Sequence, residues 1–430
     1  MIDFSLTPEQ KDLQTMVRSF ATRVVKPVVG LADREPDPLK RFLLYKPAYE
    51  RAADLGLTFA HVPKEYGGAG IGGLDEVIMT EELSAVDPGF PMYNDLAQIP
   101  IMLFGSEEQK ERWLKEPLQR IAEGKRDYIC GFALSEPGGT ASFDHPGPTP
   151  AGMTFIAEYQ SGDYVLNGRK AWVAAGGWDM QGADQNLFVV RTDTQKGGKE
   201  GLSAIIVPRG TKGIEYSPVD KYGLKGNQTV EIVCKDAHVP AENLLAEGMG
   251  DLVVTKTFTM TGPAIAATAV GCARGAFEST LEWARMFTGA SANPIFRNQV
   301  VGYMLFDIEA KIEASRYLAW KAADYLDKNG CEGGSVLMAS IAKVFATETC
   351  YEAVYDCMRV MGTNSVDATN PLNKFFRDLS IMPLYDGGNM GMQRRKGWGV
   401  MLDPEYYSQM LMDNVTMKFK KEMEGRGTEF

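Results

Sequence analysis

The residue types best suited to chemistry occur in residues 377–389, where the carboxylate of Asp386 is followed at once by Gly387 and Gly388. An apolar run precedes Asp386, and burial among apolar groups raises the pKa of a carboxylate, which makes it a better base near neutral pH. Glycines let the main chain come close to a ligand. The segment therefore suits proton abstraction from a bound molecule, although a plain turn after a helix uses the same residue types.

Length and composition indicate a globular protein of several domains. The chain has 430 residues, which predicts two or three domains, and 44% of them are apolar, enough for a sizeable core. The net charge is −11, and no basic patch or arm stands out in the sequence. Because nucleic acids and anionic membranes attract basic surfaces, we expect neither as a partner.

The thiols and imidazoles point to a reducing compartment and away from a metal site. The six cysteines are scattered without a C-x-x-C motif, which predicts reduced thiols, and the three histidines are too far apart in sequence to suggest a metal centre. The chain opens on a helix signal without the basic and apolar regions of a secretory leader, and no apolar run is long enough to span a bilayer. We therefore expect a cytoplasmic protein.

The N-terminal part has the patterns of helices. Residues 7–10 and 106–109 both have the sequence of a capping box, and residues 39–55 repeat apolar side chains at helical spacing. Pro27 is expected to end the first helix, and Pro117 to end or kink a later one. We predict a helical domain over residues 1–126.

One glycine-rich segment in this part resembles a nucleotide-binding fingerprint. Gly68, Gly70 and Gly73 match G-x-G-x-x-G. That fingerprint needs a preceding strand within a βαβ unit, whereas Pro63 and charged residues precede the glycines here. We interpret the segment as a loop between helices.

The pattern changes to strands and then returns to helices. Short alternating or continuous apolar runs lie between about 127 and 245, with turn signals at residues 161–163 and at Asn167-Gly168. Several long apolar-faced helices joined by short loops follow, which suggests a bundle. We predict a β domain over 127–245 and a helical bundle domain over 246–430.

Four segments in this order resemble the acyl-CoA dehydrogenase superfamily. They are residues 62–70, 133–140, 239–245 and 377–388. The resemblance covers nearly the whole chain, and it implies an α+β fold with an N-terminal helical domain, a central β-barrel-like domain and a C-terminal four-helix bundle.

Within that superfamily, the motifs are most similar to those of nitroalkane oxidase. Residues 176–184 look like that branch. Residues 384–389 do as well, because typical dehydrogenases have Glu followed by Gly-Thr where this chain has Asp386-Gly387-Gly388. Residues 135–140 are one residue shorter than the dehydrogenase form, as they are in nitroalkane oxidase.

The resemblance implies FAD held between the β domain and the bundle, in a homotetramer or a dimer of dimers. Trp172 could instead pack in the β core, and Gly362 could simply cap a helix. The positions that match the family's cofactor contacts are Leu134, Ser135, Thr140, Trp172, Ala174, Gly362, Gly388 and Asn389.

The resemblance also makes Asp386 the candidate base. The superfamily's other base position falls near Thr261, which is no acid here. Thr261 aligns with a serine that hydrogen-bonds the aspartate in nitroalkane oxidase, although a helix threonine can equally bond to a backbone carbonyl. Leu384 and Tyr385 are expected to keep Asp386 dry. The substrate side would include Gly387, Gln393 and Arg394.

Three positions depart from the family pattern. Ala174 stands where both branches usually carry a hydroxyl near flavin N5, and Gly289 replaces an arginine used on the FAD phosphates. Gln393 stands where an arginine pairs with the aspartate in nitroalkane oxidase. Arg394 or Arg395 could substitute only after a change of side-chain direction.

The resemblance leaves more than one function open. We expect oxidation of an acyl-CoA thioester at its α carbon, with a possible electron-transfer flavoprotein as redox partner. The alternative is oxidation of a small nitro compound with oxygen. A DNA-associated alkylation-response flavoprotein is disfavoured by the acidic balance and by the lack of a basic C-terminal extension.

Overall fold

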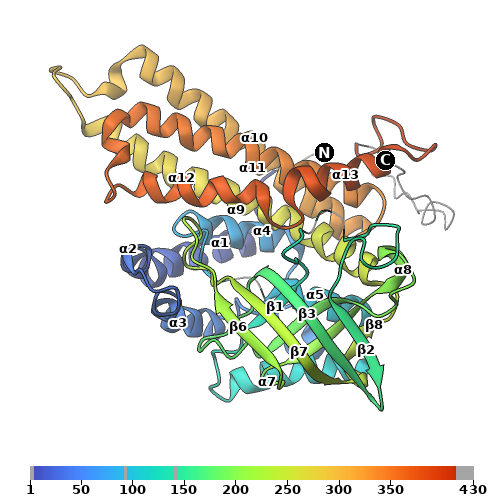
Figure 1. The fold of residues 1–430 in the computed structure, drawn as a ribbon. Coiled ribbons are helices and arrows are strands. Elements are labelled where there is room, and N and C mark those ends of the chain that lie inside the picture. Colours follow the sequence, from blue (N-terminus) through green and yellow to red (C-terminus); the bar gives the residue numbers. More distant parts are fainter. Residues whose placement is uncertain (1–3, 92–93, 140, 142, 413–430) are drawn as a thin grey trace.

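The computed structural model describes residues 4–91, 94–139, 141 and 143–412, and it has three parts. N-terminal helices, a sheet and a C-terminal set of long helices follow one another along the chain (Figure 1). The predicted α+β class, with helices before and after a β part, is confirmed. The exact domain boundaries stay predictions, since β8 ends at Ala246, one residue beyond the expected limit.

The N-terminal helices begin where their caps predict. Thr7 and Ser106 both form complete capping boxes, with Gln10 and Gln109 as the reciprocal partners. The helices of this part are α1 (Pro8–Phe20), α2 (Lys26–Arg34), α3 (Pro38–Asp54), α4 (Gly73–Ser84), α5 (Asp95–Phe104), α6 (Glu107–Lys110) and α7 (Glu116–Ala122).

The prediction that Pro27 ends the first helix is wrong. A π-helical turn over Ala21–Val25 joins α1 to α2, and the helical path continues to Arg34. The N–H of Lys26 bonds to the carbonyl of Ala21, five residues back. This wider turn just before the proline relieves the clash of its ring with the preceding turn. The turn Glu111–Lys115 precedes Pro117 in the same way.

The glycine-rich segment is a loop between α3 and α4, as the sequence predicted. The N–H groups of Gly68 and Gly70 bond to the carbonyls of Pro63 and Val62. A Cβ on Gly68 would lie 2.0 Å from the carbonyl oxygen of Val62, so this glycine is required by close contact within the loop.

The middle part is a mixed sheet in the order β6-β7-β3-β2-β4-β5-β8, with β1 beside β4. Strand β1 runs parallel to β4, and both are buried along their whole length. The strands are β1 (Cys130–Ala133), β2 (Ile156–Gln160), β3 (Asp163–Val173), β4 (Gln185–Arg191), β5 (Leu202–Pro208), β6 (Ile214–Pro218), β7 (Val230–Pro240) and β8 (Leu244–Ala246). A short helix, α8 (Gly198–Gly201), precedes β5.

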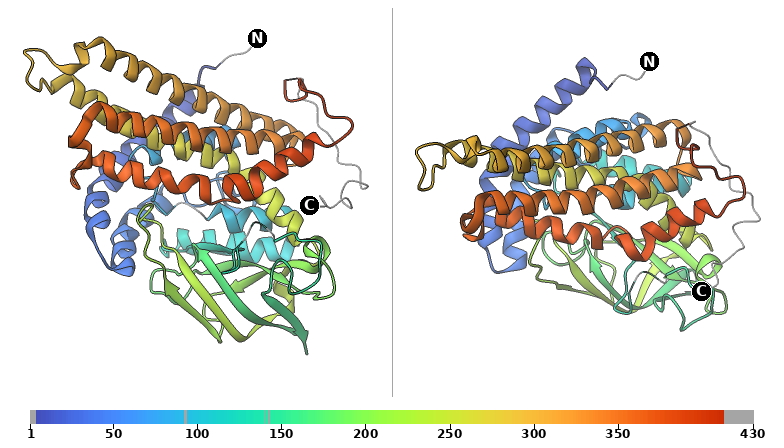
Figure 2. Two further views of the ribbon diagram at one scale, coloured as in Figure 1. Left: turned by 45° about the horizontal axis from the view of Figure 1, so that its top comes forward. Right: turned by 90° about the horizontal axis from the view of Figure 1, so that it is seen from above.

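Long helices make up the C-terminal part, where α9 packs against α10, α11, α12 and α4 (Figure 2). Alanines and other small residues let α9 and α11 approach closely in the main core cluster. Among the described residues, no helix is long and apolar enough to cross a membrane. The helices are α9 (Gly250–Met286), α10 (Gln299–Asn329), α11 (Gly334–Met361), α12 (Pro371–Ile381) and α13 (Arg394–Met401).

Candidate active site

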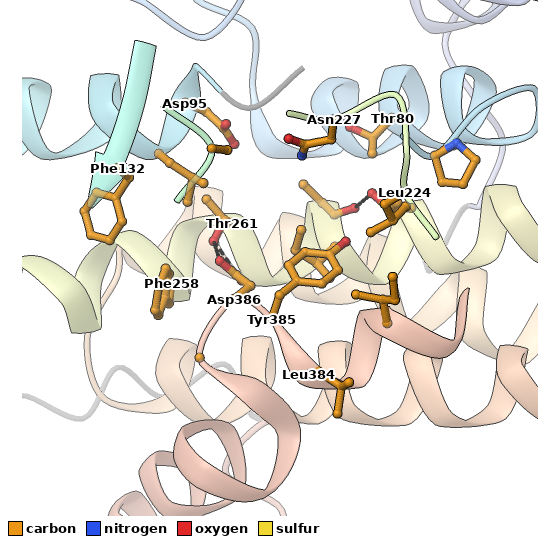
Figure 3. Close-up of a pocket in the computed structure, with 18 of the residues that line it drawn as sticks. Thr80, Asp95, Phe132, Leu224, Asn227, Phe258, Thr261, Leu384, Tyr385 and Asp386 are labelled. Carbon is orange, nitrogen blue, oxygen red and sulfur yellow. Dashed lines mark hydrogen bonds between the residues drawn. The ribbon is translucent and has the colours of Figure 1, made fainter. Parts of the chain in front are cut away.

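A cavity of about 650 Å³ lies where the three parts of the chain meet. This volume falls in the range of small-molecule sites. Helices α4 and α5, the ends of β1 and β3, helix α9 and the loop before α13 all contribute to its wall (Figure 3). The lining residues used below are Glu76, Asp95, Phe132, Leu134, Ser135, Trp172, Ala174, Phe258, Thr261, Glu348 and Tyr385 to Gly388.

Asp386 lies in a strained loop that opens onto this cavity. Its φ angle is 51°, and the next two residues, Gly387 and Gly388, have φ angles of 83° and 58°. The left-handed conformation is uncommon for residues other than glycine, although aspartate adopts it more readily than most, and such conformations cluster at functional positions. A plain turn after α12 would not need to point this carboxylate into a cavity.

Thr261 holds the carboxylate from α9. Its Oγ1 lies 3.1 Å from both Oδ1 and Oδ2 of Asp386, so the hydroxyl faces the carboxylate rather than only its own helix. Burial raises the pKa of Asp386 to about 7, while the positive charge of Lys343 and the Thr261 hydrogen bond act to lower it. A base with this pKa is half ionised near neutral pH.

The environment of Asp386 differs in one respect from the expectation. Leu384 is 71% exposed and its side chain points away from Asp386 (Figure 3), so the expectation that Leu384 keeps the carboxylate dry is wrong. Tyr385 lies beside Asp386 as expected. The aromatic rings of Phe132 and Phe258, which pack edge to face, supply the apolar wall instead.

Neither Gln393 nor Arg394 reaches the cavity wall, which counts against their predicted contacts with substrate. The Nε2 of Gln393 donates to the backbone carbonyl of Asp386 at 2.8 Å, and its Oε1 accepts from Ser340. Arg394 pairs with Glu348 through two hydrogen bonds, because its side chain turns along the bundle surface. Arg395 pairs with Asp144. Because Arg394 and Arg395 are both engaged in these ion pairs, neither is free to replace the arginine that pairs with the aspartate in nitroalkane oxidase.

Lys343 is a buried cation beneath this loop, and it was missed from the sequence. Its side chain is fully buried in α11, and Nζ donates to the carbonyl of Tyr385 and to Oδ1 of Asn389, both at 2.8 Å. The only sign of it in the sequence is a lysine among the apolar positions of a helix. Such a lysine is as often a structural residue whose hydrogen bonds are satisfied, so its spacing alone does not identify it as part of the site.

Two further acids of the cavity were also missed. Glu76 on α4 and Asp95 at the start of α5 face the cavity from the N-terminal part. Burial raises the pKa of Asp95 to about 6, and burial together with the charge of Asp95 raises that of Glu76 to about 8. At neutral pH, Glu76 is therefore largely protonated.

The predicted cofactor residues of the sheet gather at the opposite wall. Leu134, Ser135, Trp172 and Ala174 all line the cavity. Trp172 has a φ angle of 61° and is 67% exposed, which rules out the alternative that it packs in the β core. A Cβ on Gly388 would meet no atom within 4 Å, so open space lies beside the loop at this position, in the same cavity that Trp172 lines. An exposed indole beside this space fits a flat aromatic cofactor such as the flavin of FAD.

The remaining predicted cofactor residues are placed differently. The side chain of Asn389 points into the bundle, where it contacts Lys343, Thr347 and Glu348, so only its main chain could serve a cofactor. Gly362 caps the C-terminal end of α11 with a φ angle of 61°, as the alternative held. Its contact with a neighbouring subunit's cofactor stays a prediction. Thr140 lies outside the described residues.

Comparison with known proteins identifies the family. Three domain models match: acyl-CoA dehydrogenase N-terminal domain over residues 7–120, middle domain over 131–237 and C-terminal domain over 248–396. The chain belongs to the acyl-CoA dehydrogenase superfamily. Its members include flavoprotein oxidoreductases, and the matched regions span all three parts of the fold.

Relatives of both branches are similar to the chain over nearly its full length. Nitroalkane oxidase of Fusarium oxysporum is 30% identical, covering 94% of this chain and 96% of that protein. The short-chain-specific acyl-CoA dehydrogenase of Clostridium acetobutylicum is 32% identical, and the match covers 90% of this chain and 96% of that protein.

Solved structures give the same two branches. An active-site mutant of nitroalkane oxidase crystallized with 1-nitrooctane has a TM-score of 0.90 at 28% identity, covering 96% of this chain and 100% of that one. Butyryl-CoA dehydrogenase from Megasphaera elsdenii has a TM-score of 0.81 at 29% identity, and the match covers 94% of this chain and 100% of that one.

Proposed function

We propose that the protein is an FAD-dependent oxidoreductase in which Asp386 removes a proton from the carbon next to an electron-withdrawing group. The observation that carries the proposal is the position of Asp386. Its carboxylate opens onto the same cavity as Leu134, Ser135 and Trp172, the residues expected to contact the flavin. Bound FAD would accept the two electrons that leave the substrate.

The chain's own groups would perform the proton transfer. The carboxylate of Asp386 takes the α proton, and the electron pair of the broken C–H bond remains with the substrate. Thr261 keeps both carboxylate oxygens aimed into the cavity, and the rings of Phe132 and Phe258 limit the water that could compete for the base.

An acyl-CoA thioester is the first substrate candidate. Its carbonyl makes the α proton acidic, and loss of a hydride from the β carbon would then give the enoyl thioester. The three acyl-CoA dehydrogenase domain matches support it, as does the arrangement of Gln393, Arg394 and Arg395, none of which places a guanidinium on Asp386.

A small nitroalkane is the second candidate, and a specific contact favours it. Thr261 bonds to both oxygens of Asp386, at the position where nitroalkane oxidase carries a serine for its aspartate. The similarity to nitroalkane oxidase structures over the whole chain points the same way. In this case oxygen would reoxidise the flavin, whereas a thioester dehydrogenase would pass electrons to an electron-transfer flavoprotein.

Anaerobic reduction of the bound flavin tests the proposal and separates the candidates. The purified protein, loaded with FAD, is mixed with a panel of acyl-CoAs and a panel of nitroalkanes, and the flavin absorbance is followed. Bleaching by one class identifies the substrate class. If neither panel bleaches a flavin that dithionite reduces normally, the proposed reaction is wrong.

A further inference from the structure

Lys343 makes two hydrogen bonds that bracket Asp386 in the chain. Its Nζ donates to the carbonyl of Tyr385, immediately before Asp386, and to Oδ1 of Asn389, three residues after it, both at 2.8 Å. The intervening residues include the two glycines with positive φ angles. Because glycines offer little conformational restraint, these two contacts fix both ends of a segment that would otherwise be free to move.

The charge of Lys343 has no carboxylate as a direct hydrogen-bond partner among these contacts. Both of its acceptors are neutral, while nearby Glu348 is engaged by the two hydrogen bonds from Arg394. A buried cation is costly unless a negative charge lies near it. Asp386 and Glu348 are the carboxylates that favour the charged form of Lys343, so the ammonium and the base stabilise each other's charged forms.

We propose that Lys343 is the positioning residue of the base: it fixes the Tyr385–Asn389 loop and supplies a positive charge that favours the ionised form of Asp386 within the cavity. This inference rests on the proposed role of Asp386 as the base. It assigns to α11 a part in the reaction, although Lys343 does not line the cavity.

The other groups around Asp386 do not supply this charge. Thr261 on α9 is neutral, and Asp95 on α5 raises the pKa of Asp386 because the two charges repel. Gln393, just before the last helix, is neutral, and its hydrogen bond to Asp386 goes to the backbone carbonyl and not to the carboxylate. Lys343 lowers the pKa of Asp386, against the larger effect of burial.

The test compares Lys343→Met with Lys343→Arg and with a control, Lys396→Met. Lys396 is a mostly buried lysine on α13 that contacts Thr255 and Asp251 away from the cavity. Two quantities are measured against pH: the rate constant of flavin reduction in the FAD-loaded enzyme, and the protonation of the Asp386 carboxyl by infrared difference spectroscopy, with Asp386→Asn subtracted.

Loss of the positive charge must disfavour the carboxylate, so the acid limb of the rate profile in Lys343→Met should move up by about one pH unit. Near pH 7 the rate should then fall about fivefold, because the ionised fraction drops from about one half to about one eleventh, and it should recover towards pH 9. The infrared titration should shift by a similar amount, Lys343→Arg should keep most of the original profile, and Lys396→Met should leave it unchanged.

A rate that falls equally at every pH, with an unmoved infrared titration, would overturn the proposal and make Lys343 a structural residue only. Where Lys343→Met does not fold, Lys343→Gln keeps a donor without the charge and gives the same comparison. If no substrate reduces the flavin, the proposed function fails, yet the infrared titration still decides the role of Lys343, because it needs no turnover.

Discussion

At the scale of single residues, the site depends on the hydrogen bonds from Thr261 to the carboxylate of Asp386. The resemblance placed both residues at matching motifs. Their contact required the structure, since 125 residues separate them. Lys343, Glu76 and Asp95 could not be found in the same way. Each lies on a helix whose pattern explains it as well without a function. Only folding brings Glu76 and Asp95 to the cavity wall and places Lys343 beneath the loop that carries Asp386.

Thr261→Ala tests the threonine at the residue level. Removing a hydrogen bond to the carboxylate should raise the pKa of Asp386, because that bond favours the ionised form. The acid limb of flavin reduction should move up by less than one pH unit, with a rate loss of a few-fold near pH 7. Thr257→Ala is the matched control, since Thr257 lies one helical turn earlier on α9 and bonds to the carbonyl of Val253. If Thr261→Ala and Thr257→Ala show the same dependence of flavin reduction on pH, Thr261 does not stabilise the ionised form of Asp386.

The raised pKa of Asp386 has a consequence for stability. The folded protein holds the proton up to about pH 7, whereas the unfolded chain releases it near the ordinary value of 3.8. The folded state therefore binds more protons between these values, and its stability falls as pH rises from 4 to 7. Asp386→Asn removes this loss, so its Tm should exceed that of the unaltered protein at pH 7–8 and match it near pH 4. Thermal unfolding at several pH values measures this, and a Tm difference that does not grow with pH would contradict it.

At the scale of elements, caps and strand patterns were predictable because they depend on neighbours in sequence. Both capping boxes formed as expected at Thr7 and Ser106. The continuation of the helix past Pro27 was not predictable, because the π-helical turn at Ala21–Val25 depends on how the wider turn packs. The same limit applies to Leu384, whose exposure depends on the direction in which the loop leaves α12.

The loop that carries Asp386 should tolerate no side chain at Gly387. A Cβ there would lie 3.2 Å from Cβ of Met392 and from Cδ2 of Phe258, at a φ angle of 83°. Gly387→Ala should displace the carboxylate and lower the rate of flavin reduction at least tenfold. Gly399→Ala is the control on α13, where a Cβ would meet no atom within 4 Å. A Gly387→Ala enzyme with unaltered kinetics would show that the loop geometry is not needed.

At the scale of the whole molecule, the order of helices, strands and helices was predictable, and so was the family. The subunit arrangement was not, since it depends on surfaces rather than on internal patterns. We expect a homotetramer or a dimer of dimers in which Gly362 of one subunit lies near the cofactor of another. Light scattering combined with flavin absorbance tests this, and a fully active, FAD-loaded monomer would contradict it.

The central claim is that Asp386 abstracts the proton, and stopped-flow flavin reduction by Asp386→Asn tests it most directly. The amide keeps the shape of the side chain and removes the proton acceptor. General-base catalysis contributes about 10²–10⁴-fold, so anaerobic reduction with the best substrate of the panel should slow by at least about 10²-fold while FAD stays bound. If Asp386→Asn reduces the flavin as fast as the unaltered protein, Asp386 is only a turn residue and the proposed mechanism is wrong.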